Sequence, residues 1–314
     1  MHTARVTSIV IPAHNEGRVI GRLLDALLAD TSSSGPDIVV VCNGCTDDTA
    51  RVAGARGDRV RVVEIPTPSK HTALRVGDEH ARGFPRLYVD ADVVVGSADV
   101  RALAGALGRE PGLLAAAPGR DIPLTGCAWP VRAYYRVWQL LPAVREGLFG
   151  RGVIAVTEEG HQRIAALPPL MADDLAASLA FGPGERRVVE SARVVVRPPR
   201  TWADLIRRKV RAATSSAEFE RFQATQEPAG QAWPGAGPSA GRADGRAGGP
   251  VAPAAPSART GTADLRALLR ARPTLVPEVA VFAAAALAAR RGARRAIRDQ
   301  DFSTWLRDES SRQG

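Results

Sequence analysis

Four short, mostly apolar runs, rich in β-branched residues, dominate the first third of the chain. Amphipathic stretches separate them; the stretch 19–28, for example, carries apolar residues at helical spacing. Strands that are apolar without alternation are typical of a parallel sheet covered by helices on both faces. We therefore expect an α/β fold with a mostly parallel central sheet. Its strands are expected at 6–11, 38–41, 60–65 and 87–89, and its helices at 19–28, 46–53 and 71–82.

An acidic triplet follows the last of these strands. Asp90, Ala91 and Asp92 lie between the apolar runs 87–89 and 93–95. Two carboxylates one residue apart at a strand end can hold Mg²⁺ or Mn²⁺, hard cations that often reach a protein with phosphates attached. A polar strand end without any function would produce the same triplet. The other polar clusters have to decide between these two readings.

Polar clusters also follow the first two strands, where ligands bind in such sheets. In the first, Pro12 should stop the strand, and Asn15 and Glu16 could hydrogen-bond a base or ribose. An ordinary turn with a helix cap is the alternative. In the second, Asn43 and Gly44 predict a tight turn that approaches a ligand, with Thr46 or Asp47 capping the next helix.

Cys42 and Cys45 form a Cys-x-x-Cys motif in that second cluster. Structural zinc needs four ligands, and the third cysteine, Cys127, is remote and has no paired histidine. Metal binding or dithiol chemistry is thus the weaker interpretation. With three cysteines and no disulfide framework, the chain suggests a reducing compartment. We also expect no signal peptide, because the chain starts without a long apolar stretch.

Two further features have both a plain and a functional interpretation. Lys70 precedes a predicted helix, and it could be a solvated lysine or the charge partner of a diphosphate. Asp173 and Asp174 open another helix. Acids there favour the helix dipole without any function, but they could also supply a general base for transfer to a hydroxyl group.

Basic residues are concentrated towards the C-terminus. Residues 193–314 hold 21 Lys and Arg against 11 Asp and Glu, a net charge of +10, whereas residues 1–192 hold 21 against 22. This asymmetry suggests a polyanion as partner: nucleic acid, an anionic membrane or a diphosphate-bearing substrate. Interleaved aromatics and any recognised nucleic-acid module are missing, so no specific nucleic-acid binding is expected.

The organisation of the C-terminal part follows from composition. Residues 226–262 are dense in Gly, Ala, Pro and Ser and predict a flexible linker. A short helix at 264–272 and an apolar stretch at 275–289 follow, with arginines after it. Fifteen residues containing Glu278 are too few to cross a bilayer. The stretch could instead lie on an anionic membrane surface or pack on the catalytic domain.

Taken together, the clusters resemble the family 2 glycosyltransferases, which are inverting enzymes with the GT-A fold. The motif P-x-x-N-E is present as Pro12, Ala13, His14, Asn15 and Glu16. Segment 42–49 corresponds to the family's aspartate-rich loop. Segment 69–75 corresponds to its G-K-x-x-A-L-N motif, and segment 90–92 to its D-x-D motif. The late acid pair matches Asp173 and Asp174, and the glycine-bearing acceptor segment matches 150–153. The resemblance spans about residues 5–222, and the order and spacing of its motifs make it specific.

Three departures from the family pattern affect the expectations. Cys42 and Asn43 replace the paired aspartates that hold the base, so Asn43 would bind the base, expected to be uracil, through its amide. Arg75 replaces the family's asparagine. The Q-x-x-R-W motif is missing, and the helix expected there carries Arg208 and Arg211 instead. This implies transfer of a single sugar rather than processive synthesis.

The resemblance implies a role for each motif. The nucleotide of a nucleotide-diphosphate sugar would lie across 12–16, with Asp90 near the ribose and Asp92 as ligand of Mg²⁺ or Mn²⁺. Lys70, Arg208 and Arg211 would contact the phosphates. Asp174, next to Asp173, would act as general base towards an acceptor hydroxyl near Gly152 and Val153.

The expected organisation is a catalytic domain at 1–225, the linker at 226–262 and a basic helical extension at 263–314. We expect a cytoplasmic enzyme, peripheral at the inner face of the plasma membrane. Lipid-linked, polysaccharide and small-molecule acceptors all remain open. The alternative function is an inactive nucleotide-binding or regulatory module of the same fold.

Overall fold

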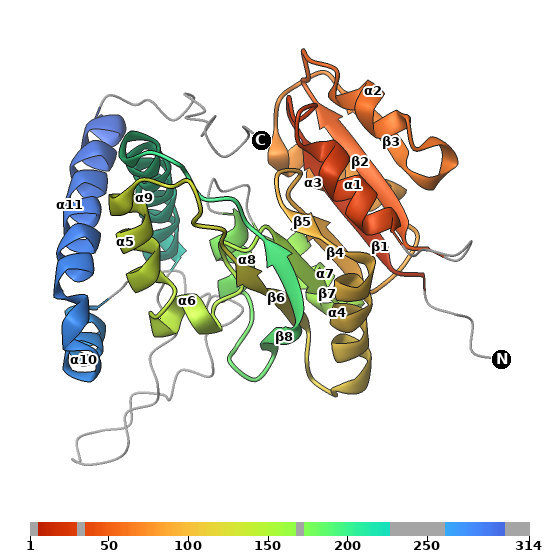
Figure 1. Cartoon of the computed structure of the whole chain (residues 1–314). Helices are drawn as coiled ribbons and strands as arrows, with labels where there is room; N and C mark the ends of the chain where they lie inside the picture. The colour runs from red at the N-terminus through yellow and green to blue at the C-terminus, as the bar shows by residue number, and fades with distance from the viewer. Residues whose placement is uncertain (1–5, 30–34, 168–172, 227–260, 299–314) are drawn as a thin grey trace.

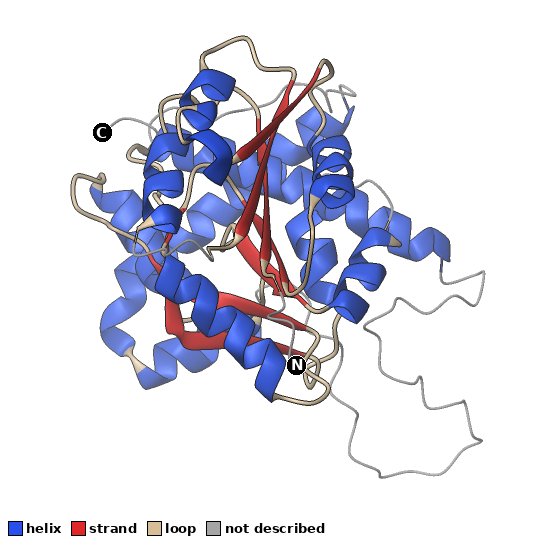
Figure 2. Cartoon of the chain, turned by 90° about the vertical axis from the view of Figure 1, so that its right-hand side faces the viewer, coloured by secondary structure: helices blue, strands red, loops and turns tan. Residues whose placement is uncertain are grey.

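The computed structural model describes residues 6–29, 35–167, 173–226 and 261–298. Its centre is an eight-stranded sheet with the strand order β3-β2-β1-β4-β7-β6-β8-β5. Figure 2 shows this sheet edge-on with helices on both of its sides. The expected α/β fold is confirmed. The expected linker at 226–262 lies almost wholly outside the described residues.

The first four strands run parallel, as the sequence predicts. They are β1 (Ser8–Ala13), β2 (Asp37–Asn43), β3 (Arg61–Ile65) and β4 (Arg86–Val89). Pro12 does not stop β1, contrary to our expectation. Strand β4 pairs only with Ser8 to Val10, so on that side nothing needs the N–H that proline lacks.

The second half of the sheet is mixed. Strand β7 (Val153–Val156) runs antiparallel to both β4 and β6 (Ala115–Asp121). Strand β8 (Arg186–Val195) is parallel to β6, and the two-residue β5 (Val94–Val95) is antiparallel to β8. The D-x-D segment therefore joins the parallel half of the sheet to its far edge.

Helices cover both faces of the sheet. On one face, α1 (Ile20–Leu28) and α2 (Thr49–Gly54) share a core cluster with Ile9, Ile11 and Val40, and α4 (Ser97–Arg109) packs on β6 and β8. On the other, α3 (Lys70–His80) packs on β1 and β2, and α7 (Glu158–Ala165) packs on β7. Helix α8 (Asp173–Leu179) packs with Phe149 and Leu167. A Cβ on Gly77 would lie 2.3 Å from Val10 Cγ1, so α3 approaches β1 this closely only with glycine there.

A layer of helices stands at the opposite end of the molecule from β1, β2 and β3 (Figure 1). It consists of α5 (Trp129–Trp138), α6 (Pro142–Glu146), α9 (Trp202–Gln226), α10 (Thr262–Ala271) and α11 (Val276–Arg298). Tyr134 of α5 stacks on Phe282 of α11, with ring centroids 5.1 Å apart. The extension thus packs on α5 and α9.

The C-terminal helix is longer than the sequence suggested. Residues Pro273–Arg298 form a helical stretch of 26 residues that is long and apolar enough, by length and composition, to cross a membrane. Our expectation that the stretch is too short for this is wrong, because the helix continues through the arginines that follow the apolar run. One face of it is buried at Val279, Phe282, Ala285 and Ala289.

Candidate active site

The D-x-D segment leaves β4 against a glycine loop. The Asp90 backbone N–H donates to the Gly152 carbonyl at 2.8 Å, directly after the paired residues Val89 and Val153. Gly152 has φ +65°, and a Cβ there would lie 2.5 Å from Val93 Cγ1 and 3.2 Å from Asp90 Oδ2. Only glycine satisfies both the dihedral angle and the close approach.

Lys70 and Asp90 form an ion pair, with Nζ and Oδ1 2.8 Å apart. Lys70 is the first residue of α3, whose N-cap Ser69 accepts a hydrogen bond from the Thr72 N–H through its Oγ at 3.2 Å. The cap orients the helix so that its first residue faces the end of β4. Two expected site residues that are 20 positions apart are thereby brought together.

The basic residues of α9 lie near the same carboxylate. The surrounding protein displaces water from Asp90, which would raise its pKa, although 40% of the side chain stays exposed. The charges of Lys70, Arg211 and Arg208 outweigh this, and the pKa of Asp90 lies below its ordinary value. Asp90 is therefore an anion at neutral pH. The structure also brings Arg208 and Arg211 to the D-x-D segment.

Asp92 has different neighbours. Its side chain is half-buried, and among the described residues its carboxylate forms no hydrogen bond or ion pair. Its charge acts on Arg22 of α1, together with that of Arg197 after β8. Burial and the like charge of Arg197 lower the pKa of Arg22, and Asp92 opposes this. Neither arginine was singled out from the sequence, because neither belongs to one of the motifs.

The donor set at Asp92 suits a divalent cation that arrives with its substrate. Within the described part of the chain, no group of three or more His, Cys, Asp or Glu side chains could hold a metal ion. Mg²⁺ commonly takes only one or two protein carboxylates and completes its shell with phosphate oxygens and water. The carboxylate of Asp92, which accepts no hydrogen bond from the described part of the chain, fits that requirement.

The candidate base, Asp174, contacts the same glycine loop. Asp174, exposed at the start of α8, accepts a hydrogen bond from the Gly150 N–H through Oδ2 at 2.9 Å. Gly150 also has φ +65°. Gly152, two residues further, holds Asp90 through its carbonyl. The side chain of Asp173 lies outside what the structure describes.

Arg120 and Arg151 stabilise this loop through hydrogen bonds to backbone carbonyls. Arg151 is 2% exposed and donates to the carbonyls of Pro118 (2.8 Å) and Gly147 (3.0 Å). Arg120 stacks on the Trp138 ring, 4.5 Å from its centroid, and donates to the Gly150 carbonyl at 3.3 Å. Burial lowers the pKa of Arg120 to about 9 and that of Arg151 to about 10. Both remain cations near pH 7, and each satisfies carbonyls that the tight loop would leave without a partner.

The P-x-x-N-E segment meets the loop after β2. Asn15, with φ 52°, accepts through Oδ1 from the N–H groups of Thr46 (2.6 Å) and Asp47 (3.3 Å). The Glu16 N–H donates to Thr49 Oγ1 at 2.7 Å. His14 Nδ1 lies 2.6 Å from the Asn43 carbonyl. These contacts join the ends of β1 and β2 into one surface.

Four expected site residues have buried side chains. Pro12 and Ala13 lie inside β1, Ala91 is 4% exposed, and Val153 is 3% exposed in the core. Any contact of theirs with a ligand would therefore come from the backbone. Alternation along β7 points the Val153 side chain into the core, so an acceptor near Gly152 and Val153 would meet the backbone there.

Asn43 is a structural residue here, contrary to its expected role at the base. It is 3% exposed, its Nδ2 donates to the Ala13 carbonyl at 2.8 Å, and its Oδ1 accepts from the Ser69 N–H at 3.1 Å. The amide thus ties β1 to the start of α3 and is not available to a base. One partner of the amide precedes Asn43 by 30 residues and the other follows it by 26, so only the folded chain brings them together.

A cavity of about 430 Å³ opens beside the end of β2. Burial raises the pKa of Cys42, which lines it, to about 12, so this thiol stays protonated at neutral pH. Cys45 Sγ lies 3.4 Å from the Asn15 N–H and from the Ala13 carbonyl. The environment of Cys42 thus disfavours the thiolate that metal binding or dithiol chemistry would need. The cavity is lined by Cys42, Gly44, Cys45, Thr46, Glu64, Ile65 and Pro66.

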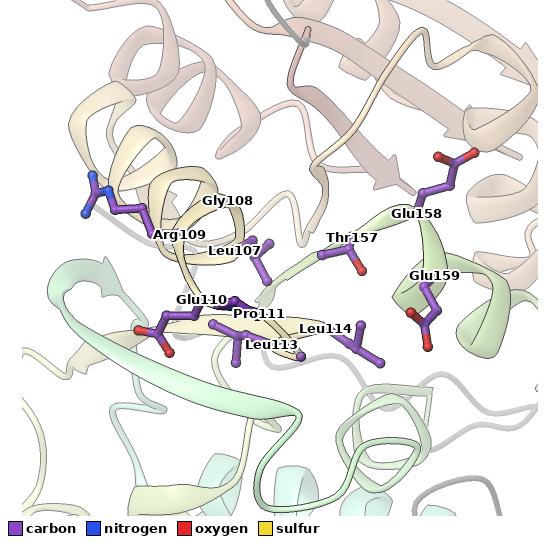
Figure 3. Close-up of a pocket in the computed structure, with 11 residues that line it drawn as sticks. Leu107, Gly108, Arg109, Glu110, Pro111, Leu113, Leu114, Thr157, Glu158 and Glu159 are labelled. Carbon is purple, nitrogen blue, oxygen red and sulfur yellow. The ribbon is translucent and has the colours of Figure 1, made fainter.

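A second cavity of about 350 Å³ lies away from these residues (Figure 3). It opens between the end of α4, the start of β6 and the start of α7, where Glu110, Glu158 and Glu159 surround it. Val156 pairs with Arg86 at the start of β4, so the cavity lies at the amino end of that strand. The D-x-D segment follows its carboxyl end.

Sequence comparison agrees with the site. Residues 8–151 match Glycosyl transferase family 2. A 4,4'-diaponeurosporenoate glycosyltransferase of Staphylococcus aureus (strain USA300) is 37% identical over 93 residues, 28% of this chain and 24% of that protein. A dolichyl-phosphate beta-glucosyltransferase of Drosophila melanogaster is 36% identical over 100 residues, 27% of this chain and 30% of that protein. The chain thus matches less than a third of the length of these relatives.

Among solved structures, glucosyl-3-phosphoglycerate synthase from Mycobacterium tuberculosis in complex with Mn²⁺, UDP-glucose and phosphoglyceric acid is similar. It shares 21% sequence identity, with 60% of this chain and 70% of that chain covered and a TM-score of 0.46. The match to the family sequence model covers the D-x-D segment, Lys70 and the start of the glycine loop. Residues 8–151 of this chain are therefore similar in sequence to the family 2 glycosyltransferases.

Proposed function

We propose that the chain transfers a single sugar from a nucleotide-diphosphate donor to an acceptor hydroxyl, with inversion at the anomeric carbon. One observation carries this proposal. A loop of three residues binds Asp174 through the Gly150 N–H and Asp90 through the Gly152 carbonyl. It therefore holds a candidate base and the candidate donor site at a short, fixed spacing.

The transfer step uses the carboxylate of Asp174. It takes the proton of the acceptor hydroxyl while the hydroxyl oxygen forms a bond to the anomeric carbon. The bond from that carbon to the diphosphate breaks on the opposite side, and the nucleoside diphosphate leaves with the electron pair. General-base help of this kind is typically worth about 10²–10⁴ in rate.

The donor would be held by charge at its phosphates and by the cavity at its base. Lys70, Arg208 and Arg211 surround Asp90 and supply positive charge, which supports a diphosphate there. Asp92 is the residue that would hold Mg²⁺ or Mn²⁺, and a bound cation would neutralise charge on the leaving diphosphate. The cavity beside Cys42 and Glu64 is where we place the base. We expect the nucleotide of the donor to be UDP.

A panel of UDP-, GDP-, dTDP- and ADP-sugars, each with and without Mn²⁺, tests this function through release of the nucleoside diphosphate. We expect one donor to be turned over, with Asp92→Asn abolishing the metal-dependent part. The variant Asp58→Asn, at an exposed acid in a short helical turn away from the site, is the matched control. A panel without turnover, combined with metal-dependent binding of a nucleotide, would support the alternative of an inactive nucleotide-binding module.

The C-terminal helix supports a location at an anionic membrane surface. Val276 is 57% exposed and Leu287 52% exposed, while Phe282 on the buried face packs on Tyr134. The helix can thus be docked on the protein and still present apolar residues outwards. Arginines suited to acidic headgroups follow these residues at 290, 291, 294, 295 and 298. We propose that the enzyme is cytoplasmic and binds this surface peripherally, with a lipid-linked acceptor as one candidate.

Flotation of the full chain with phosphatidylserine-containing and neutral vesicles tests this placement. We expect flotation with the anionic vesicles alone, and its loss when Arg290, Arg291, Arg294 and Arg295 are all changed to Gln. Changing Arg266, Arg270 and Arg272 to Gln removes basic charge from α10 instead and is the control. Equal binding to neutral vesicles would contradict the electrostatic part of the proposal.

A further inference from the structure

We infer that the guanidinium groups of Arg22 and Arg197 bind the donor's diphosphate on the Asp92 side of the D-x-D segment. This inference rests on the proposed function, because it assigns the ligand by the chemistry of that donor. It adds two residues from distant parts of the chain to the phosphate site. Lys70, Arg208 and Arg211 serve the Asp90 side.

Arg22 reaches the site because of how α1 begins. The Val19 and Ile20 N–H groups both donate to the Glu16 carbonyl at 2.9 Å, so α1 starts directly from the P-x-x-N-E segment. Ile20, Leu23 and Leu24 then face the core. Arg22 lies between these buried positions and is half-buried itself.

Arg197 reaches the site through strand register. Val94 pairs with Val195, and Val95 pairs with Val194, in the antiparallel pair β5–β8. Asp92 lies two residues before Val94, and Arg197 two residues after Val195, so this pairing brings both residues to the same end of the strand pair. The Arg197 carbonyl also accepts a hydrogen bond from Arg208 Nη1 at 3.3 Å, which connects this strand end to α9.

The electrostatics at this point favour an added anion. Arg22 experiences the like charge of Arg197 as well as the opposite charge of Asp92, in a partly buried setting. Two guanidinium groups held near each other repel, and an anion bound between them reduces that repulsion. Lys70, Arg208 and Arg211 act on Asp90 with positive charge, and Arg22 experiences the positive charge of Arg197. These cations would attract a dianionic diphosphate.

These contacts would contribute most when the bond between the sugar and the diphosphate breaks. Charge on the diphosphate increases as the sugar leaves, and preorganised cations stabilise developing charge at little cost of reorganisation. Guanidiniums also suit phosphate oxygens because their planar N–H groups can bind two of them at once. Arg22 and Arg197 would therefore lower the barrier to transfer as well as hold the donor.

Binding of inorganic pyrophosphate, measured by titration calorimetry with and without Mg²⁺, tests the inference without needing the true donor. Arg22→Gln and Arg197→Gln should each weaken binding about ten- to a hundredfold, as expected for the loss of a charged hydrogen bond. Arg22→Lys and Arg197→Lys, which keep the charge, should restore part of it. Arg18→Gln, at an exposed arginine just before α1, is the matched control and should change binding less than about twofold.

A separate measurement does not depend on replacing either arginine. In Asp92→Asn, both guanidiniums lose their competing carboxylate, so metal-free pyrophosphate should bind more tightly than it does to the wild type. Wild-type affinity in both Gln variants, or no gain in Asp92→Asn, would overturn the inference. Unchanged sugar turnover in the Gln variants would overturn it while leaving the proposed function intact. Arginine-dependent pyrophosphate binding without turnover of any donor would instead refute the function and keep the anion site.

Discussion

The carboxylate of Asp174 and the backbone N–H of Gly150 are joined by a 2.9 Å hydrogen bond across 24 residues of chain. Because Gly152 holds Asp90 two positions further on, the separation of base and D-x-D segment depends on one short loop. The dihedral angles of Gly150 and Gly152 and the buried arginines below them determine the shape of that loop.

Asp174→Asn should remove transfer and leave the loop in place. The asparagine carbonyl oxygen can still accept from the Gly150 N–H, whereas it cannot take a proton from an acceptor hydroxyl. We expect transfer to fall by about 10²–10⁴ with the nucleotide affinity unchanged within about twofold. Steady-state kinetics and calorimetry on the same preparation check this. Wild-type transfer by the variant would exclude Asp174 as the base.

Gly152→Ala should disrupt the site through the loop. The new Cβ would collide with Val93, 2.5 Å away, in addition to the strain of the positive φ. Gly112→Ala is the matched control, because φ is +83° there and nothing lies within 4 Å of the added Cβ. Both changes should cost about 1–3 kcal/mol of stability from backbone strain. Only Gly152→Ala should also lower turnover, and equal turnover in the two variants would argue against the loop's role.

The Lys70–Asp90 pair predicts a specific dependence of stability on pH. The pKa of Asp90 is depressed in the folded protein, so its contribution is present above the ordinary value of 3.8 and is lost as the pH falls through the lower, folded value. Lys70→Met removes the nearest cation and should reduce Tm at neutral pH. Thermal unfolding from neutral to strongly acidic pH should show the gap between wild type and variant closing on the acid side. A gap that stays constant would contradict the pair's contribution.

Phe282→Ala tests whether the C-terminal helix belongs to the folded body. Phe282 is 6% exposed and stacks on Tyr134, so truncation should cost about 3–5 kcal/mol, the usual range for a buried phenylalanine. Leu287→Ala, on the exposed face of the same helix, should change the free energy of unfolding by less than about 0.5 kcal/mol. Urea unfolding measures both. A small effect of Phe282→Ala would mean that α11 unfolds separately from the remaining core.

Local pattern was sufficient for the first half of the fold. Continuous apolar runs predicted β1, β2, β3 and β4, and helical spacing predicted α1, because burial on both faces leaves a direct record in residue type. The strands β6, β7 and β8 were not anticipated. Their positions depend on pairing between distant segments, and such register is not visible in a single run of residues.

The candidate site divides in the same way. Asp90, Asp92, Lys70 and Asp174 were identified from their types and their places after strands or before helices. Asn43 was assigned to a base, but its amide is used between Ala13 and Ser69, which only the packed chain brings together. Arg22, Arg120, Arg151 and Arg197 carry no local signal at all. Each acquires its role from neighbours remote in sequence.

The linear chain was thus enough to specify the parallel half of the sheet, the D-x-D segment and the kind of chemistry that its carboxylates and lysine can support. These follow from side-chain type and short-range periodicity. Tertiary structure was needed to show that Gly150 and Gly152 join Asp174 to Asp90, that the charges of Asp92 and Arg197 act on Arg22, and that α11 packs on α5 and α9. Charge interactions and packing act through space, so their partners become defined only once β-strand register and helix docking have brought distant residues together.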